Sequence, residues 1–237
     1  MEKTTWYQEL GFYNNPFSIK PGAYSNDIYG HDDVIKDVIT KVENSNIIYI
    51  TGPYGTGKTS ILKRIIYEFK GKKQIIYYNC NQKEKSIDFD NLLINAGGFI
   101  NKFFKIRKKN MILLVDEVQD LNKKDMHLIV EYYKLGFFKS IILASKKEDI
   151  ELSKELVDAI GRNRYDLKEI TNDEAIKIIR KRIGNIGFMT DEIIIKIFKK
   201  NKNPRAFLKN CEDVCRFSFE SGAKKISEKD IDLALKN

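Results

Sequence analysis

The sequence predicts an α/β protein, in which a parallel sheet flanked by helices is followed by a C-terminal domain of helices alone. A glycine-rich loop of the phosphate-binding type lies between an apolar run and a helical pattern. Strand-like apolar runs then alternate with helical patterns as far as Leu167, which favours a parallel sheet. Beyond Ile170 only helical periodicity remains. We therefore expect an aromatic-rich arm over 1–27, a nucleotide-binding core over 28–169 and a helical lid domain over 170–237.

The loop at 52–59 reads Gly-Pro-Tyr-Gly-Thr-Gly-Lys-Thr and matches the pattern G-x-x-x-x-G-K-[ST]. Glycines let such a loop wrap a phosphate, whose oxygens then meet backbone N–H groups and a helix N-terminus. Lys58 is expected to reach the β- and γ-phosphates of a nucleotide, and the Thr59 hydroxyl to ligate Mg²⁺. The residues predicted to bind the nucleotide here are Gly52, Pro53, Tyr54, Gly55, Thr56, Gly57, Lys58, Thr59 and Ser60.

The elements of the core follow from apolar runs and from helical spacing. Strands are expected at 46–50, 74–79, 111–115, 140–144 and near 164–167. Helices are expected over 34–42, from the loop to Phe69, over 90–106 with a weak middle at Gly97-Gly98, over 124–135 and over 151–160. Asp32 or Asp33 is the expected cap of the first helix, and His31 beside it is expected to be structural.

The lid is expected to contain four helices, because cap residues precede apolar positions at helical spacing. Thr171 and Glu174 form a capping box that opens the first helix. Asn203 is an N-cap residue before a proline, which opens the third helix. The second and fourth helices begin at Thr190 and Ser227.

The composition excludes several classes of protein. No apolar run approaches the roughly 18 residues of a membrane helix, and the N-terminus lacks the pattern of a secretory signal. Cys80, Cys211 and Cys215 form no metal-ligand pattern, so we expect buried thiols in a reducing compartment. A cytoplasmic location without a membrane partner follows.

The charge permits two interpretations. Lys and Arg number 42 against 33 Asp and Glu, a net charge of +9, which would favour a polyanion such as nucleic acid. A chain generally rich in Lys, Ile and Asn would show the same excess. Five bases surround Phe103 and Phe104 at 102–109, and such a cluster can bind single strands by stacking and charge. We favour an amphipathic helix whose phenylalanines face the sheet and whose lysines are solvated.

Two carboxylates follow the apolar run at 111–115. Asp116 ends a strand that we expect next to the strand of the loop, where a carboxylate holds Mg²⁺ through its water shell. Glu117 can orient and deprotonate an attacking water. The pair therefore predicts hydrolysis of the nucleotide.

The P-loop, the Asp-Glu pair and an all-helical lid together resemble the AAA+ ATPases. The resemblance is greatest to the branch that holds the archaeal and eukaryotic origin-recognition initiators and related small archaeal ATPases, and it covers about 28–220. It implies a P-loop NTPase sheet of the AAA+ type, with ATP and Mg²⁺ as ligands. Those initiators usually carry a winged-helix domain after the lid, whereas this sequence ends at Asn237. We therefore expect any DNA contact to come from the core, the lid, the arm or a partner.

The resemblance also implies roles for single residues. Ser145 matches the sensor-1 position, which contacts the γ-phosphate or the attacking water, and Arg205 resembles the sensor-2 arginine. Arg162 lies where the family places an arginine finger for the neighbouring subunit, and Arg164 is the alternative inside a strand. Tyr29 and Gly30 match the positions that hold the adenine ring in the family. Asn79 matches the residue that restrains the catalytic glutamate.

The function predicted is that of an ATP-driven switch or remodeller in DNA transactions such as replication, repair or mobile-element handling. An arginine finger acting on a neighbour would require self-assembly or a protein partner. The alternative is a nucleotide-gated interaction or signalling module with little turnover and no direct contact with DNA. A small-molecule kinase is disfavoured by the helical lid and by the Asp-Glu pair.

Overall fold

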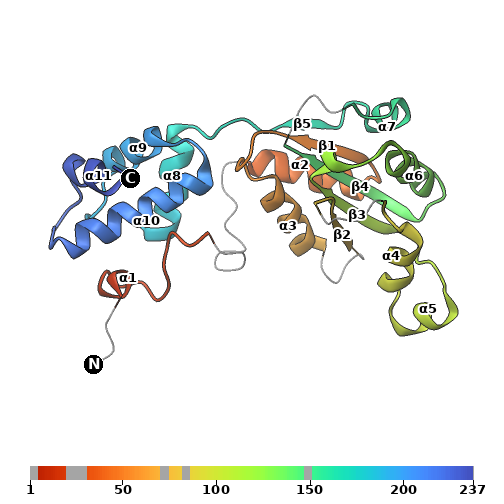
Figure 1. Cartoon of the computed structure of the whole chain (residues 1–237), viewed down its shortest axis with the longest axis horizontal. Coiled ribbons are helices and arrows are strands. Elements are labelled where there is room, and N and C mark those ends of the chain that lie inside the picture. Colours follow the sequence, from red (N-terminus) through yellow and green to blue (C-terminus); the bar gives the residue numbers. More distant parts are fainter. Residues whose placement is uncertain (1–4, 20–30, 70–74, 82–85, 147–150, 237) are drawn as a thin grey trace. The chain divides into compact units, whose positions relative to one another are not determined.

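The computed structural model describes residues 5–19, 31–69, 75–81, 86–146 and 151–236. The chain forms two compact units, which we call the core unit (31–168) and the helical unit (1–30 with 169–237). Figure 1 shows the elements of both. Within the described ranges, no helix combines the length and the apolar character needed to cross a bilayer.

The core unit is built on a five-stranded sheet whose pairs are all parallel, as expected from the alternation of strands and helices. The strands are β1 (Ile47–Thr51), β2 (Ile75–Asn79), β3 (Met111–Asp116), β4 (Phe138–Ser145) and β5 (Arg164–Asp166). Their order is β2-β3-β4-β1-β5. The expectation that β3 lies next to β1 is wrong, because β4 lies between these two strands and pairs with both. β4 is the longest strand and is almost wholly buried, which suits the central position.

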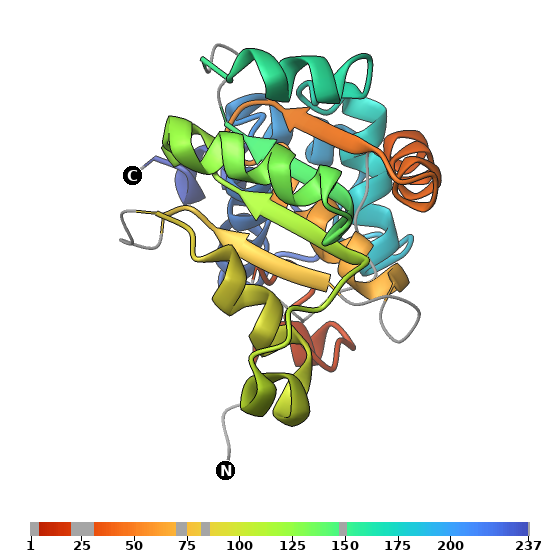
Figure 2. The same ribbon diagram turned by 90° about the vertical axis from the view of Figure 1, so that its right-hand side faces the viewer.

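Helices cover both faces of the sheet (Figures 1 and 2). The helices of the core unit are α2 (Asp32–Glu43), α3 (Lys58–Phe69), α4 (Phe89–Ala96), α5 (Gly98–Phe104), the 3-10 turn η1 (Val118–Asp120), α6 (Lys123–Lys134) and α7 (Lys154–Ile160). The helices α2 and α3 pack together on one face, and α6 and α7 on the other. Successive side chains of a strand point to opposite faces of the sheet, so alternate residues pack against different sets of helices. Tyr49, Leu113 and Leu143, for example, join the core beneath α4, α6 and α7.

Two local predictions for the core unit are wrong. The helix expected over 90–106 is two helices, because Gly98 has φ 78° and a Cβ on Gly97 would lie 2.2 Å from the Asn101 side chain. The cap of α2 is His31, and neither aspartate accepts a capping hydrogen bond there. Asp32 and Asp33 lie inside the first turn, where their charge still favours the helix dipole.

The helical unit contains α8 (Asn172–Ile183), α9 (Asp191–Lys200), α10 (Pro204–Glu220) and α11 (Glu228–Ala234), together with the short α1 (Trp6–Glu9). The capping box at Thr171 and the N-cap at Asn203 are confirmed. Periodicity did not predict α1, which has only four residues. The described part of the N-terminal arm packs on this unit. Phe17 is buried in the core of the helical unit, and Arg182 donates a hydrogen bond to the Pro16 carbonyl at 2.9 Å.

Candidate nucleotide-binding site

The loop between β1 and α3 has a backbone that requires glycine. Gly52, Gly55 and Gly57 have φ values of 146°, 87° and 103°. A Cβ on Gly52 would also lie 2.5 Å from the carbonyl oxygen of Leu167. The loop leads directly into α3, which begins at Lys58. The N–H groups of its first turn are thus available to an anion, as the motif predicts.

Lys58 is buried within this loop. Its Nζ donates hydrogen bonds to the carbonyl oxygens of Gly52 at 2.6 Å and Pro53 at 2.8 Å. Burial lowers the pKa of Lys58 from its ordinary value of 10.5, while the nearby charges of Glu117 and Asp116 oppose this. The loop therefore holds a desolvated ammonium group at the place where phosphates are expected.

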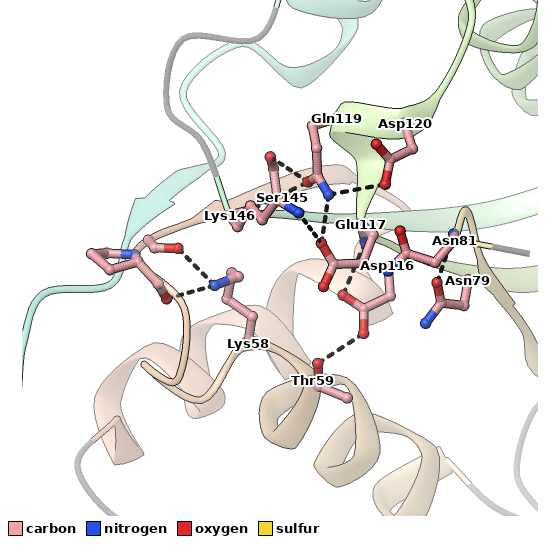
Figure 3. A network of polar contacts seen from close by, with 12 residues as sticks. Lys58, Thr59, Asn79, Asn81, Asp116, Glu117, Gln119, Asp120, Ser145 and Lys146 are labelled. Carbon is pink, nitrogen blue, oxygen red and sulfur yellow. Dashed lines mark hydrogen bonds and ion pairs between the residues drawn. The ribbon is translucent and has the colours of Figure 1, made fainter. Parts of the chain in front are cut away.

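Thr59 in α3 and Asp116 at the end of β3 meet at the carboxyl end of the sheet (Figure 3), although β4 lies between β3 and the strand β1 that leads into the loop. The Thr59 hydroxyl donates to Asp116 Oδ2 at 2.8 Å, and the Tyr77 hydroxyl donates to the same oxygen at 3.1 Å. Burial, with a contribution from the Asp116 charge, raises the pKa of Tyr77 to about 12, so this phenol remains a donor near neutral pH. Hydroxyl and carboxylate oxygens are ligands that suit Mg²⁺.

Glu117, the next residue after Asp116, has a left-handed backbone conformation with φ 58°. Its Oε2 accepts a hydrogen bond of 2.5 Å from Gln119 Nε2 and lies 3.9 Å from Lys146 Nζ (Figure 3). Gln119 also accepts from the Ser145 hydroxyl at 3.1 Å and from the Lys146 backbone N–H at 3.3 Å. A single amide thus joins the predicted base to the predicted sensor residue.

Gln119 was not predicted from the sequence. Its only signal was its place two residues after Glu117. The turn η1, which contains Gln119 and is capped by Glu117, brings the two side chains together. Asn79, the residue that the resemblance assigns to restrain Glu117, accepts instead from the Asn81 backbone N–H at 2.9 Å. His31 is likewise joined to the loop, because its Nε2 lies 2.9 Å from the Thr56 carbonyl oxygen.

Arg162 and Arg164, the predicted arginines of the core unit, lie apart from this cluster. Arg162 is exposed in the turn between α7 and β5, at the amino edge of the sheet, whereas the loop lies at the carboxyl edge. At about 3.3 Å per residue, β1 separates these edges by roughly 15 Å. Arg164 is in β5 opposite Tyr49, and Arg205 is exposed in the first turn of α10 in the helical unit. Tyr29 and Gly30 lie outside the described residues.

The structure therefore brings five predicted residues together in the core unit, namely Lys58, Thr59, Asp116, Glu117 and Ser145. In the described part of the chain, no group of three or more His, Cys, Asp or Glu side chains could hold a metal ion by itself. A metal at this site would thus be held by Asp116 together with the Thr59 hydroxyl and oxygens from phosphate and water, as is usual for Mg²⁺ beside a nucleotide.

Comparison with known proteins gives a relative by sequence and several solved structures of similar fold. The chain is 22% identical over 188 residues to the "probable ABC transporter ATP-binding protein in ycf23-apcF intergenic region" of Cyanophora paradoxa, covering 73% of this chain and 69% of that one. The structure of Cdc6p from Pyrobaculum aerophilum matches with a TM-score of 0.70 at 15% identity, covering 93% of this chain and 70% of that one.

Two further solved structures share the fold. The Drosophila ORC bound to DNA matches with a TM-score of 0.71 at 14% identity, and the overlap covers 98% of this chain and 66% of that one. The RuvB Holliday junction branch migration motor of Thermotoga maritima matches with a TM-score of 0.67 at 18% identity, covering 88% and 69%. The family model described as "AAA domain" matches residues 44–175, more than half of the chain. This chain therefore belongs to the AAA domain family.

Proposed function

We propose that the chain binds Mg-ATP at the loop of 52–59 and hydrolyses it. The observation that carries this proposal is the convergence of Lys58, Thr59, Asp116 and Glu117 at the carboxyl edge of the sheet. A phosphate-binding loop alone serves many activities. A carboxylate bonded to the loop threonine, followed by a second acid, is the arrangement required for hydrolysis with a magnesium ion.

Each of these residues has its own role in binding and hydrolysing ATP. Lys58 exchanges its bonds to the loop carbonyls for the β- and γ-phosphates, and the backbone N–H groups of the loop bind the same oxygens. Thr59 and Asp116 hold Mg²⁺, which neutralises charge on the phosphates when it is bound. Glu117 accepts the proton of the attacking water, and Ser145 orients that water or the γ-phosphate.

Further residues serve the same nucleotide. Tyr29 and Gly30 hold the adenine ring, and Arg205 contacts the γ-phosphate. Arg162 serves the site of a neighbouring subunit, where it would neutralise charge that grows on the γ-phosphate. The position of Arg162 at the amino edge of its own sheet supports action in trans, because this edge is far from the chain's own loop. Self-assembly, or assembly with a related protein, is therefore part of the proposal.

The proposed process is a DNA transaction such as replication, repair or mobile-element handling, in which ATP drives a switch or a remodelling step. Two structural relatives are described as an ORC bound to DNA and as a Holliday junction branch migration motor. The net charge of +9 supports a polyanionic partner. A reducing, cytoplasmic setting is consistent with Cys80, Cys211 and Cys215, which are all free thiols.

Two substitutions test the enzyme. Lys58→Ala should abolish ATP binding measured by calorimetry. Glu117→Gln should retain binding while lowering phosphate release by about 100-fold or more, the usual contribution of a positioned base. Lys63→Ala, an exposed lysine of the same helix, is the matched control and should change neither value. Unaltered turnover in Glu117→Gln would refute the assignment of the base. Release of phosphate as the only product would exclude a kinase.

A second candidate function is a nucleotide-gated interaction or signalling module with little turnover. The bonds that Glu117 makes to Gln119 and Lys146 favour it, since they engage the predicted base. A wild-type protein that binds Mg-ATP tightly, releases almost no phosphate and shows no DNA binding at low salt would support this candidate. Binding to DNA that weakens steeply as salt rises would support the first.

A further inference from the structure

The residues 98–110, which we call the α5 loop, present a surface of exposed aromatic rings. Phe99, Phe103 and Phe104 have exposed fractions of 83%, 73% and 64%. The expectation that Phe103 and Phe104 face the sheet is therefore wrong. The chain breaks after α4, and α5 is a separate helix whose main packing partner is α4. Figures 1 and 2 show α5 beyond α4, away from the strands.

The three exposed rings, which we call the platform, all belong to the seven residues of α5. Phe99 and Phe103 are four residues apart in α5 and share a face of the helix. The rings of Phe103 and Phe104 meet edge to face, with 5.0 Å between their centroids. Three large rings exposed on a helix of seven residues cost solvation free energy without stabilising the fold. Such a group of residues indicates contact with something outside the chain.

All charged side chains of the α5 loop are positive. Residues 98–110 contain no Asp or Glu, and the five bases are Lys102, Lys105, Arg107, Lys108 and Lys109. Arg107 pairs with Asp90 at 3.1 Å and lies over the Phe137 ring, which Lys109 also approaches. Lys102, Lys105 and Lys108 have no carboxylate partner among the residues that the structure describes. Three cations beside the platform are thus available to an anionic ligand.

The backbone of the α5 loop is held in one shape by its own polar groups. The Asn101 side chain donates to the Ile106 carbonyl oxygen at 2.9 Å, and the Ile106 N–H donates to the Asn101 carbonyl at 2.9 Å. The Lys108 N–H bonds to the Leu93 carbonyl at 3.3 Å, which ties the end of the loop to α4. The rings and lysines are therefore presented without a large ordering cost on binding.

We propose that the α5 loop binds single-stranded nucleic acid, whose bases stack on the three phenylalanines and whose phosphates contact the three lysines. This rests on the DNA-directed part of the proposed function and assigns that contact to one surface. Stacking needs base faces, which a duplex hides and a single strand exposes. An acidic protein would satisfy the lysines, but it would have no general need for flat rings at this spacing.

The test is fluorescence anisotropy of a labelled oligothymidylate and of a labelled duplex, with ATP turnover measured on the same samples. The intact protein should prefer the single strand. Joint substitution of Phe99, Phe103 and Phe104 by Leu keeps an apolar surface and removes the rings, so affinity for the single strand should fall at least tenfold. Joint substitution by Tyr should retain it. Turnover should remain unchanged in both variants, because these side chains are remote from Lys58.

The lysines are tested by charge-matched variants. Joint substitution of Lys102, Lys105 and Lys108 by Ala should reduce the slope of log affinity against log salt by about 2, since each phosphate contact to a single strand contributes about 0.7. The control replaces Lys177, Lys199 and Lys209 of the helical unit by Ala, with the same change in net charge, and should leave the slope unchanged.

Several results would overturn the proposal. Full affinity in the Leu variant would show that an apolar protein surface, not a base, is the occupant. Equal loss in both lysine variants would assign the effect to overall charge. Absence of nucleic-acid binding at low salt would reject this surface and the DNA-directed process together, whereas DNA binding that none of these variants weakens would reject the surface alone. ATP hydrolysis, tested through Lys58 and Glu117, is judged separately.

Discussion

At the scale of single residues, the most informative feature is the amide of Gln119. It donates to Glu117, accepts from Ser145 and also donates to Asp120 Oδ2 at 3.2 Å. The bond from Gln119 occupies Glu117 Oε2, so it must be released before this oxygen can turn toward an attacking water. The left-handed backbone of Glu117 adds strain, which costs of order 1–3 kcal/mol at such positions and is common at functional sites. We infer that Gln119 is a positioning residue that restrains Glu117.

The first prediction follows from this bond. Gln119→Ala should raise basal phosphate release by roughly tenfold, because a hydrogen bond to a charged group is worth about 1.5–3 kcal/mol and 1.36 kcal/mol corresponds to a factor of ten in rate. ATP affinity should be unchanged, since Gln119 makes no bond to the loop among the contacts of the described residues. Steady-state kinetics that separate kcat from KM provide the measurement.

Asn79→Ala is the matched control for this prediction. Asn79 ends β2 beside Asp116 in register, and its side chain serves the turn to Asn81. It should therefore leave basal turnover within twofold, roughly the scatter of a surface change. A fall in kcat for Gln119→Ala would mean that the amide positions Glu117 for catalysis and does not restrain it.

Residues in a contiguous motif could be predicted, and residues that depend on folding could not. Lys58 and Thr59 were predictable because the loop motif fixes their positions, and Asp116 and Glu117 because they directly follow a wholly apolar run. Tyr77 reaches Asp116 only through the register of β2 with β3, which no local pattern reveals. Gln119 reaches Glu117 through a positive φ at a residue that is not glycine, a conformation that sequence does not announce.

At the scale of elements, Asp125 joins two segments that sequence does not connect. This buried carboxylate, in the first turn of α6, accepts from Ser86 Oγ at 2.6 Å, the Ile87 N–H at 3.1 Å and Asn122 Nδ2 at 2.9 Å. It thereby fixes the start of the segment that enters α4. A carboxylate with these donors is satisfied despite its burial.

Asp125→Ala should lower the free energy of unfolding by about 2–3 kcal/mol, because it leaves the buried Ile87 N–H and the Ser86 hydroxyl without their acceptor. Urea denaturation followed by circular dichroism measures this loss. Asp158→Ala, an exposed carboxylate on α7, should change the value by less than about 0.5 kcal/mol. An equally small effect of both substitutions would contradict the role given to Asp125.

The strands were the most predictable elements. The order of the strands in the sheet and the break between α4 and α5 were the least predictable. Apolar runs identified β1, β3 and β4, since strands buried on both faces of a parallel sheet leave little room for polar residues. Order was not accessible, because β3 and β4 are equally apolar and nothing local shows which of them pairs with β1. The separation of α4 from α5 was indicated by sequence only as a weak point at Gly97-Gly98. It results from the positive φ of Gly98 and from the close approach of the Asn101 side chain to Gly97.

At the scale of the whole molecule, the chain is divided between two cores, and its first residues belong to the second of them. Phe17 is 1% exposed within the core of the helical unit, beside residues more than 150 positions away in the sequence. The Trp6 ring stacks on the Phe17 ring, with 6.1 Å between their centroids. Asn15 adds a hydrogen bond of 2.7 Å to Glu212 of α10. Packing on the helices therefore accounts for Trp6, Phe12 and Phe17 of the aromatic-rich arm.

Two thiols and one indole can report on this packing. Burial raises the pKa of Cys211 and Cys215 in α10 well above the ordinary range of a thiol, so near pH 8 both are uncharged as well as inaccessible. Cys80 lies in the core unit, is partly exposed, and has a pKa raised to about 12 by burial. Trp6 is the only tryptophan in the sequence, so its emission reports on the arm alone.

Phe17→Ala should destabilise the helical unit by about 3–5 kcal/mol, the usual cost of removing a buried phenylalanine. Because thiol labelling proceeds through opened states, the labelling rate of Cys211 and Cys215 near pH 8 should rise by more than a hundredfold, at 1.4 kcal/mol for each factor of ten. Trp6 emission should shift to the red as its stacking partner is lost. Cys80 should keep its slow labelling rate, which makes it the internal reference.

The matched control is Tyr13→Ala, at a side chain 94% exposed on the same arm, which should alter none of these values. Unchanged labelling in Phe17→Ala would show that α8 to α11 hold their core without the arm.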